Sequence, residues 1–397
     1  MILSRKAQQI EPSITLAITA KAKKMKADGI DVIGFGAGEP DFNTPEYIQK
    51  AAIKAIKEGY TKYTPASGIM ELKNAIVEKF RKDNGLEYNT SQIIISTGAK
   101  QSLANVFAAA LNPGDEVIIP VPYWVSYPEL VKLQGGVPIF VETEENNGFK
   151  YTIEKLEKAI TKNTKMILIN SPNNPTGTVY SKKELEDIAN FAKEKDILIL
   201  SDEIYEKLIY GDTKHVSIAS LSGDAYQRTI VINGVSKAYA MTGWRIGYAA
   251  ANKEIVRLMS NIQSHTTSNP NSIAQYASVA ALKGDTSSMD SMVAEFKNRR
   301  DYMVNEINRI DGLSCIKPEG AFYVMMNISK TIGKKFNDVK IEDSISFCDQ
   351  LLEREKVAVI PGIGFGIDNY VRLSYATSAE NIEKGLDRIG RFVKELK

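Results

Sequence analysis

The feature that most constrains the fold of this chain is a series of short apolar runs, rich in β-branched residues, between residues 92 and 251. Near-continuous apolar runs are typical of strands that are buried on both faces, as in parallel sheets. Segments with the character of helices separate the runs, and this alternation predicts an α/β layered domain. The predicted strands are 92–96, 116–120, 137–141, 165–170, 196–200, 229–233 and 245–249.

Two of the intervening helices carry boundary signals. The segment 181–184 has the pattern of a capping box, which opens a predicted helix through Ala192. The segment 112–115 (Asn-Pro-Gly-Asp) ends a helix that begins near Lys100. The strand ends and helix starts therefore recur in the regular order that is expected of an α/β layered domain.

After about residue 286 the pattern changes. A long charged helix containing residues 298–301 precedes short strand candidates at 322–326 and 357–360, and a final amphipathic helix starts at Glu380. We expect a large domain with a mostly parallel sheet and helices on both faces, and a smaller α+β domain built from both termini. The expected parts are 1–45 (small domain), 46–285 (large, cofactor-binding domain) and 286–397 (small domain).

Composition excludes several classes of function. The 397 residues include 50 basic and 48 acidic ones, a net charge of +2 with no basic stripe, so nucleic-acid binding is not indicated. No apolar run is long enough to span a bilayer, and the polar start has no signal-peptide core, so a cytoplasmic protein is expected.

The few cysteines and histidines argue against metal or Ser-His chemistry. Cys315 and Cys348 lie far apart and lack the spacing of metal ligands, so free thiols in a reducing compartment are expected. His215 and His265 are the chain's two histidines and leave little material for a histidine-rich metal site. No metal is therefore expected.

Lys237 and Arg245 suggest a specific chemistry. Lys237 follows the predicted strand 229–233, where burial would lower the pKa of its ammonium group and free the amine to attack a carbonyl. Arg245 is close in sequence, and a guanidinium is a common fork for phosphate. Together they suggest an aldehyde cofactor that carries a phosphate and is held as a Schiff base. The plainer interpretation is a surface lysine and a structural arginine.

Three other strand ends carry polar residues suited to such a cofactor. Asp202 could pair with a protonated ring nitrogen, and Tyr205 could donate to a phenolic oxygen. The rigid turn 171–177 would fix the amide of Asn174. Small residues at 96–99 leave backbone N–H groups open at a helix start, which suits a phosphate. Ordinary turns and a helix cap at Asp202 are the alternatives.

Two further residues complete the candidate site. Arg372 lies in a strand-like apolar segment, where a guanidinium could bind a substrate carboxylate through two hydrogen bonds; a structural salt bridge is the alternative. Trp124 follows a strand end and could stack on a cofactor ring, or could belong to the core.

The order and spacing of these motifs resemble those of a known family. Segments 171–177 (SPNNPTG), 201–205 (SDEIY), 236–239 (SKAY) and 371–374 (VRLS) resemble the class I aminotransferases, fold type I enzymes that depend on pyridoxal 5′-phosphate. Three more segments are similar to the aspartate aminotransferases of the prokaryotic subgroup Ib. They are 38–42 (GEPDF), 63–68 (YTPASG) and 122–127 (PYWVSY).

The resemblance implies a role for each motif residue. Lys237, after Ser236, would be the Schiff-base lysine and proton shuttle, Asp202 would pair with the pyridine nitrogen, and Trp124 would stack on the ring. Asn174 and Tyr205 would hold the phenolic oxygen. The remaining implied residues are Gly98, Ala99, Arg245 and the neighbouring subunit's Tyr63 for the phosphate, and Arg372, Asn174 and the Gly38 backbone for the substrate α-carboxylate. A homodimer with shared sites follows from the role of Tyr63.

The substrate is implied less directly. The segment 263–268 has no arginine to bind a side-chain carboxylate, and in subgroup Ib a lysine in the phosphate turn takes part of that role, where this chain has Lys100. A cation there favours aspartate and glutamate. Ser13 and Thr15 could help as the N-terminal helix closes over the substrate. Glu11 stands where some prephenate-using members carry lysine, which argues against prephenate. An aminotransferase of broader range remains the alternative.

Other classes of function are weaker. The segment 32–38 resembles a glycine-rich dinucleotide turn, but Pro40 follows and would not continue the required helix. An aminotransferase-like transcription factor would need an added DNA-binding domain, for which the resemblance leaves no residues. A lyase or decarboxylase on the same cofactor stays open, because reaction choice depends on which Cα bond stands perpendicular to the ring.

Overall fold

The centre of the molecule is a seven-stranded sheet. The computed structural model describes residues 3–397, so Met1 and Ile2 of the polar start lie outside the described residues. The strand order is β2-β8-β7-β6-β5-β3-β4; β8 runs antiparallel to both neighbours and the other pairs are parallel. The strands are β2 (Ile93–Ser96), β3 (Glu116–Val121), β4 (Val137–Glu142), β5 (Thr164–Asn170), β6 (Leu198–Asp202), β7 (Thr229–Gly234) and β8 (Gly247–Ala250).

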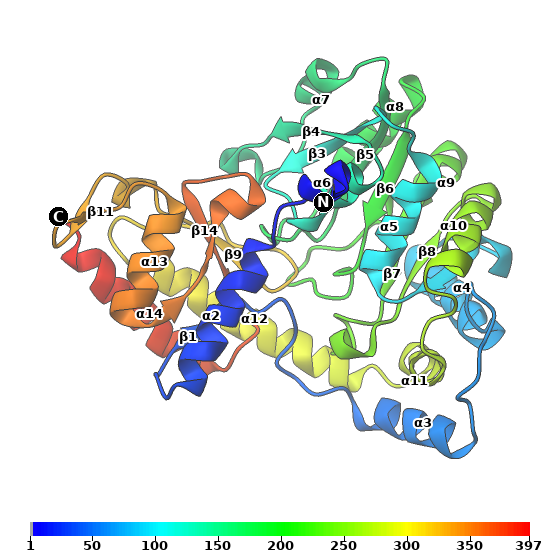
Figure 1. Cartoon of the computed structure of the whole chain (residues 1–397), viewed down its shortest axis with the longest axis horizontal. Coiled ribbons are helices and arrows are strands. Elements are labelled where there is room, and N and C mark those ends of the chain that lie inside the picture. Colours follow the sequence, from blue (N-terminus) through cyan, green and yellow to red (C-terminus); the bar gives the residue numbers. More distant parts are fainter. Residues whose placement is uncertain (1–2) are drawn as a thin grey trace.

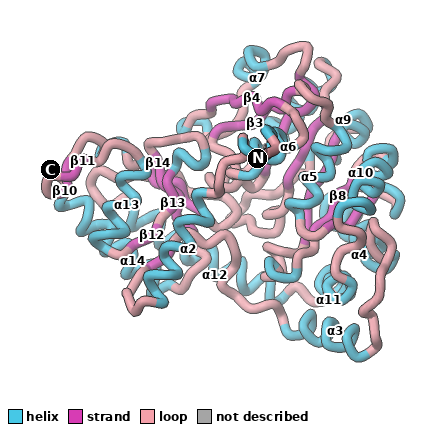
Figure 2. The backbone as a smooth tube through the Cα atoms, viewed as in Figure 1, coloured by secondary structure: helices cyan, strands magenta, loops and turns pink. Residues whose placement is uncertain are grey.

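Helices cover both faces of this sheet (Figures 1 and 2). Alternate residues of the strands point to opposite faces: Ile118 packs under one layer, and Val117 and Ile119 under the other. The layer with Val117 has α5 (Ala99–Ala110), α6 (Ser126–Leu133) and α10 (Lys253–Thr266). The opposite layer has α3 (Glu46–Lys57), α4 (Met70–Asn84), α7 (Ile153–Ala159), α8 (Lys182–Glu194), α9 (Gly223–Arg228) and α11 (Ser272–Lys283).

A second group of elements lies beside the first and contains an antiparallel sheet of three strands, ordered β13-β14-β9. Its pairing places Arg372 opposite Met325 and Ser374 opposite Tyr323, so these four side chains share one face. Its elements are α12 (Ser287–Ile307), β9 (Tyr323–Asn327), β10 (Lys335–Phe336), β11 (Val339–Lys340), α13 (Ser344–Glu355), β12 (Val357–Ala358), β13 (Ile360–Pro361), β14 (Tyr370–Ser374) and α14 (Ala379–Glu395).

The N-terminal segment joins this second group. The segment contains α1 (Arg5–Gln8), α2 (Ile14–Ala27) and β1 (Ile33–Gly34), and β1 pairs in parallel with β12. The Arg388 guanidinium also donates to the carbonyl oxygen of Asp31 at 2.8 Å. This arrangement supports a small domain built from both ends of the chain, while the proposed boundaries near residues 46 and 286 stay a prediction.

The predicted α/β fold is confirmed, with local differences. The capping box of Ser181 and Glu184 is present at the start of α8. The predicted strand 357–360 divides into β12 and β13, because its two halves pair with different partners. The run 137–141 forms β4 as predicted. However, β4 is an edge strand, and its Val137 and Phe140 side chains are 42% and 44% exposed. The prediction that this strand is buried on both faces was therefore wrong.

The cysteines and the possible membrane-crossing segments were the other features considered from composition. Cys315 and Cys348 are buried and form no disulfide. Among residues 3–397, no helix combines the length and apolar character needed to cross a membrane.

Candidate active site

A pocket of about 560 Å³ opens at the carboxyl ends of the parallel strands, between the two groups of elements. Ligands of open α/β sheets bind at this edge because loops there follow every strand. Most residues that the sequence predicts for the site line this one pocket. They are Ser13, Thr15, Gly38, Ala99, Lys100, Trp124, Asn174, Asp202, Tyr205, Ser236, Lys237, Arg245 and Arg372.

Lys237 lies in the turn that follows β7 and extends into the pocket. Its Nζ donates to the carbonyl oxygen of Gly38 at 2.5 Å. Burial lowers the pKa of Lys237 to about 8; the Glu39 carboxylate opposes this, and the Arg245 guanidinium adds to it. An amine with this pKa is partly neutral near physiological pH and can act as a nucleophile or a proton carrier.

Asp202 is the last residue of β6, and its carboxylate faces the pocket from a fully buried position. The Tyr127 hydroxyl donates to Asp202 Oδ2 at 2.7 Å, and the backbone N–H of Ile204 donates to Oδ1 at 3.2 Å. Burial raises the pKa of Asp202 to about 6, against the opposing effect of the Tyr127 hydrogen bond. A buried carboxylate of this kind is stabilised as an anion by a cationic partner.

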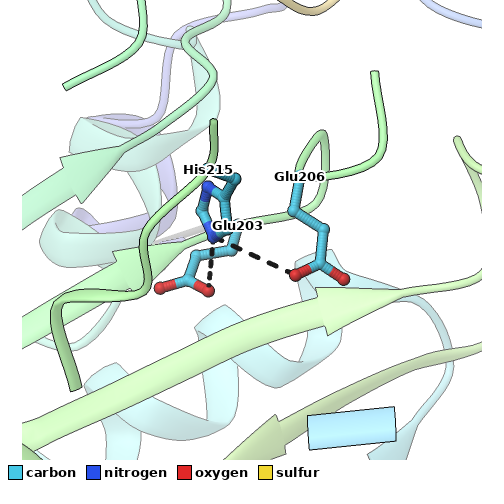
Figure 3. A group of neighbouring side chains, drawn as sticks. All are labelled: Glu203, Glu206 and His215. Atoms are coloured by element: carbon cyan, nitrogen blue, oxygen red, sulfur yellow. Dashed lines mark hydrogen bonds and ion pairs between the residues drawn. The ribbon is translucent and has the colours of Figure 1, made fainter. Parts of the chain in front are cut away.

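The turn that follows Asp202 is held by a cluster of buried and partly buried polar side chains. Figure 3 shows His215 between Glu203 and Glu206, with His215 Nε2 at 3.0 Å from Glu203 Oε2. Lys79 forms an ion pair with Glu206 and, although burial alone would raise it, holds the pKa of that carboxyl at about 2. Lys79 therefore supplies a positive charge to this cluster of buried glutamates. The contacts among Lys79, Glu203, Glu206 and His215 hold the turn that follows Asp202 and contains Tyr205.

The loop between β5 and α8 presents Asn174. Its peptide bonds before Pro172 and Pro175 are cis. Asn170 Oδ1 accepts from the backbone N–H of Asn174 at 2.8 Å, and Asn174 Oδ1 accepts from Arg372 Nη1 at 2.9 Å. The loop therefore connects the end of β5 directly to the arginine of the second group.

Arg372 is in the middle of β14 and is only 2% exposed. Its Nη2 donates to the carbonyl oxygen of Gly36 at 3.2 Å, whereas Nε is buried and has no hydrogen-bond partner among residues 3–397. No carboxylate lies within ion-pair distance of it in the described chain. Burial lowers the pKa of Arg372. A buried guanidinium with an unused N–H donor is suited to bind the carboxylate of a ligand.

Gly98 and Arg245 form a concave seat at the start of α5. Gly98 is the N-cap of α5 with φ of 82°, and a side chain there would collide with the Arg245 guanidinium. Arg245 Nη1 donates to the carbonyl oxygen of Thr242 at 2.7 Å, and the guanidinium lies against Gly98 at the helix N-terminus. Open N–H groups beside a cation are a suitable seat for a phosphate.

The residues expected to bind the substrate side chain, Lys100, Ser13 and Thr15, also line the pocket. The Lys100 ammonium is 4.9 Å from the centre of the Trp124 ring, and burial, with Arg245 adding to it, lowers the pKa of Lys100. Ser13 caps α2 by accepting from the backbone N–H of Leu16 at 3.4 Å. Thr15 Oγ1 is buried and has no hydrogen-bond partner in the described residues.

Three findings differ from the sequence analysis or add to it. Tyr63 is 91% exposed and lies outside this chain's own pocket, and its role at a neighbouring subunit's site stays a prediction. The Gly38 carbonyl contacts Lys237, while Gly36 contacts Arg372. Tyr127 and Tyr323 also line the pocket but had no predicted role. Tyrosines next to motif residues, at 122–127 and after the glycine at 320, were the signal available in the sequence.

Comparison with known proteins gives one consistent result. The sequence profile of the family described as "Aminotransferase class I and II" matches residues 30–389. An aspartate aminotransferase of Bacillus subtilis (strain 168) is 53% identical over 395 residues, covering 100% of both chains. An aspartate/prephenate aminotransferase of Nitrosomonas europaea is 48% identical over 392 residues, covering 98% of this chain and 99% of the relative.

The solved structures agree with this result. The crystal structure of an aspartate aminotransferase from Rhizobium meliloti superposes with a TM-score of 0.97 at 44% identity, and the match covers 100% of both chains. The three comparisons agree: the family profile matches most of the chain, the relatives match over their full length, and the solved structure has the same fold. The chain belongs to the class I and II aminotransferase family.

Proposed function

We propose that this protein is an aspartate aminotransferase that binds pyridoxal 5′-phosphate and transfers the amino group of L-aspartate to 2-oxoglutarate in a ping-pong cycle. The observation that carries the proposal is the convergence of Lys237, Asp202 and Arg372 on one pocket, from the two sides of the molecule. These groups supply an amine, an anion and a carboxylate-binding cation, which amino-group transfer requires together.

The residues of the pocket fit this cofactor. The buried Asp202 carboxylate has no cationic partner in the ion pairs of the described residues, and a protonated ring nitrogen would supply one. The seat formed by Gly98 and Arg245 matches the phosphate group, and Trp124 offers a ring face for stacking. When bound, pyridoxal 5′-phosphate supplies an electron sink that stabilises negative charge developing at the substrate Cα.

The protein's own residues would then perform the remaining tasks. Lys237 would hold the cofactor covalently and, once displaced by the substrate amine, move the proton at the substrate Cα. Arg372 would orient the substrate by its α-carboxylate, and Tyr205 and Asn174 would hold the cofactor's phenolic oxygen. Asp202 would keep the ring nitrogen protonated, which maintains the electron-withdrawing character of the ring.

Preference for a dicarboxylic substrate rests on Lys100. Its ammonium lies in the pocket beside Trp124, and Arg372 lines the same pocket. A substrate with two carboxylates could therefore reach one cation with each. The broader alternative, which includes prephenate or aromatic amino acids, is favoured by the full-length relative named for both aspartate and prephenate.

Assembly and location also belong to this proposal. A homodimer would bring the exposed Tyr63 of one subunit to the phosphate seat of the other. The near balance of charges and the absence of a membrane-crossing helix among residues 3–397 are compatible with a cytoplasmic enzyme.

The test is the visible absorbance of the protein reconstituted with pyridoxal 5′-phosphate. We expect a yellow protein whose band is lost on addition of L-aspartate alone and returns with 2-oxoglutarate. Borohydride reduction followed by peptide mapping should place the label on Lys237. A yellow protein that does not respond to L-aspartate but responds to L-phenylalanine would favour the broader alternative. A protein that cannot be reconstituted would overturn the role of Lys237.

A further inference from the structure

Tyr323 is a second buried phenol next to Tyr205. The two hydroxyl oxygens lie 2.9 Å apart, and the rings meet edge to face with centroids 5.9 Å apart. Tyr323 is 1% exposed and Tyr205 4% exposed, and both line the pocket. Because the pair is removed from bulk water, the hydrogen bond between the two hydroxyls is a fixed part of the site.

The two tyrosines come from different groups of elements. Tyr205 follows β6 of the seven-stranded sheet, whereas Tyr323 begins β9 of the three-stranded sheet. The contact between them is one of the points at which the two sheets meet inside the pocket. It places β9 against the turn that follows Asp202 at the end of β6.

Backbone hydrogen bonds fix Tyr323 relative to both neighbouring loops. The N–H of Gly320 donates to the carbonyl oxygen of Gly177 at 2.8 Å, in the loop that presents Asn174. The N–H of Ala321 donates to the carbonyl oxygen of Leu208 at 2.9 Å, just beyond Tyr205. The start of β9 is therefore bound to the loops of the larger sheet, and its position does not depend on the side chain of Tyr323 alone.

Arg372 lies on the ring of Tyr323. The guanidinium carbon is 4.4 Å from the ring centre, and both residues project from one face of the antiparallel sheet. A cation over a phenol ring draws electron density from it and strengthens its hydroxyl as a hydrogen-bond donor. The carboxylate-binding arginine and Tyr205 are thus connected through a single side chain.

Counting hydrogens decides the direction of the bond between the two hydroxyls. A tyrosine hydroxyl has one hydrogen to donate. If the Tyr205 hydrogen is used for the cofactor's phenolic oxygen, as in the proposed function, the hydrogen between the tyrosines must come from Tyr323. A hydroxyl that accepts a hydrogen bond becomes a stronger donor.

We propose that Tyr323 is a positioning residue that donates to the Tyr205 hydroxyl and so directs and strengthens the hydrogen bond from Tyr205 to the cofactor's phenolic oxygen. This inference rests on the proposed function. When bound through Lys237, the cofactor would supply a proton that its phenolic oxygen and the Lys237 nitrogen could share. A hydrogen bond donated to that oxygen weakens its hold on the proton and lowers the pKa of the pair. Loss of the Tyr323 hydroxyl should therefore raise that pKa.

The experiment is a pH titration of the visible absorption band of the loaded enzyme. The variants are Tyr323→Phe, Tyr205→Phe and the double variant, each of which retains the ring. Tyr151→Phe is the matched control, since it removes a buried hydroxyl that contacts Ile118 and Leu168 in the larger sheet and lies outside the pocket. Thermal unfolding of each variant verifies that it is folded.

We expect the midpoint to rise by roughly 0.3 to 0.6 pH units in Tyr323→Phe, from a modest weakening of one charge-assisted hydrogen bond. Tyr205→Phe should raise it further, and the double variant should match Tyr205→Phe, because Tyr323 acts through Tyr205. The KM for L-aspartate should change less than about 2-fold, since Arg372 keeps its contacts.

Each contrary result has one meaning. A Tyr323→Phe midpoint equal to those of wild type and Tyr151→Phe would overturn the role of Tyr323. So would a double variant whose change is the sum of the two single changes. A wild-type protein that acquires no visible band would overturn the proposed function together with this inference, so the two failures are distinguishable.

Discussion

The two sheets contribute to the pocket in different ways. The seven-stranded sheet presents its residues from loops and strand ends, as with Lys237 after β7 and Asp202 at the end of β6. The three-stranded sheet presents Arg372 from the middle of a strand, with ladder pairing on both sides. Strand ends tolerate varied side chains, whereas a residue in mid-strand is held by the backbone of two neighbours.

This difference indicates a division of labour. Residues at the strand ends of the larger sheet suit the chemistry, because burial moves the pKa of Lys237 down to about 8 and that of Asp202 up to about 6. The arginine on the smaller sheet suits binding, because its position is rigid and its charge is permanent. Changes in the larger sheet should therefore affect mainly kcat and the cofactor, and changes in the smaller sheet mainly KM.

Replacing Lys237 should have the largest effect. We expect Lys237→Ala to lower kcat by at least about 10⁴-fold, because both the covalent attachment and the proton carrier are lost. Single-turnover kinetics with L-aspartate would measure this. Lys195→Ala, which removes a surface lysine paired with Glu157, is the control and should retain full activity. A loss below 100-fold in Lys237→Ala would contradict the assignment.

Lys237 should also leave a signature in stability without cofactor. Its pKa falls from 10.5 in the unfolded chain to about 8 in the folded one, so the buried charge destabilises the fold below pH 8. Lys237→Met should therefore raise Tm at pH 7. The difference from wild type should shrink as pH rises from 8 toward 10.5, because the folded wild type then loses the unfavourable charge first. A difference that is constant with pH would contradict the lowered pKa.

Replacing Arg372 tests the smaller sheet. We expect Arg372→Lys to lower kcat/KM by about 10- to 100-fold for every amino acid, through KM, because a lysine cannot form the paired hydrogen bonds of a guanidinium. Steady-state kinetics with L-aspartate and L-alanine would measure this. Affinity for pyridoxal 5′-phosphate should stay near that of wild type. A main effect on cofactor affinity would break the division between the sheets.

Replacing Lys100 sharpens the comparison, because this residue lies on α5, beside the larger sheet, but is expected to bind the substrate and not to react. We expect Lys100→Ala to raise KM for L-aspartate by about 5- to 10-fold, the value of one partly screened ion pair. KM for L-alanine or an aromatic amino acid should change by less than about 2-fold. Equal effects on all three substrates would remove Lys100 from substrate recognition.

The smallest effect on activity should come from His215. We expect His215→Ala to reduce the free energy of unfolding by about 1 to 2 kcal/mol, because buried Glu203 loses a hydrogen-bond partner. The kcat should fall by no more than about 2-fold, since Ser201 and Ser217 still donate to Glu203 at 2.8 Å. Chemical denaturation and steady-state kinetics would measure both. A large loss of kcat with unchanged stability would show that the cluster of His215, Glu203 and Glu206 controls Asp202 directly.

Local patterns in the sequence were sufficient for most elements of the fold. The strands β3 and β7, the capping box of α8 and the final helix all follow from apolar periodicity and cap residues. Strand order and edge position depend on pairing between distant segments, which local patterns do not contain. The exposed side chains of β4 and the division of 357–360 between two partners were missed for that reason.

The candidate site shows the same limit. Lys237, Asp202 and Asn174 stand in motifs at strand ends, so their types and spacing made them identifiable. Tyr323 and Tyr205 are 118 residues apart, and their contact depends on how β9 meets the turn after β6. The hydrogen bond from Tyr127 to Asp202 is of the same kind, because it joins α6 to the end of β6.

The pairing of β1 with β12 has a consequence for the order of folding during synthesis. Residues 33–34 can form their ladder only after residues 357–358 have left the ribosome, whereas the larger sheet is contained within residues 93–250. Long-range pairing of this kind is slow because a large loop must close first. The seven-stranded sheet can therefore assemble while translation continues, whereas Arg372 on β14 can join the pocket only near the end of synthesis. Under the proposed function, the nascent chain would form the wall that holds the cofactor before the wall that holds the substrate α-carboxylate.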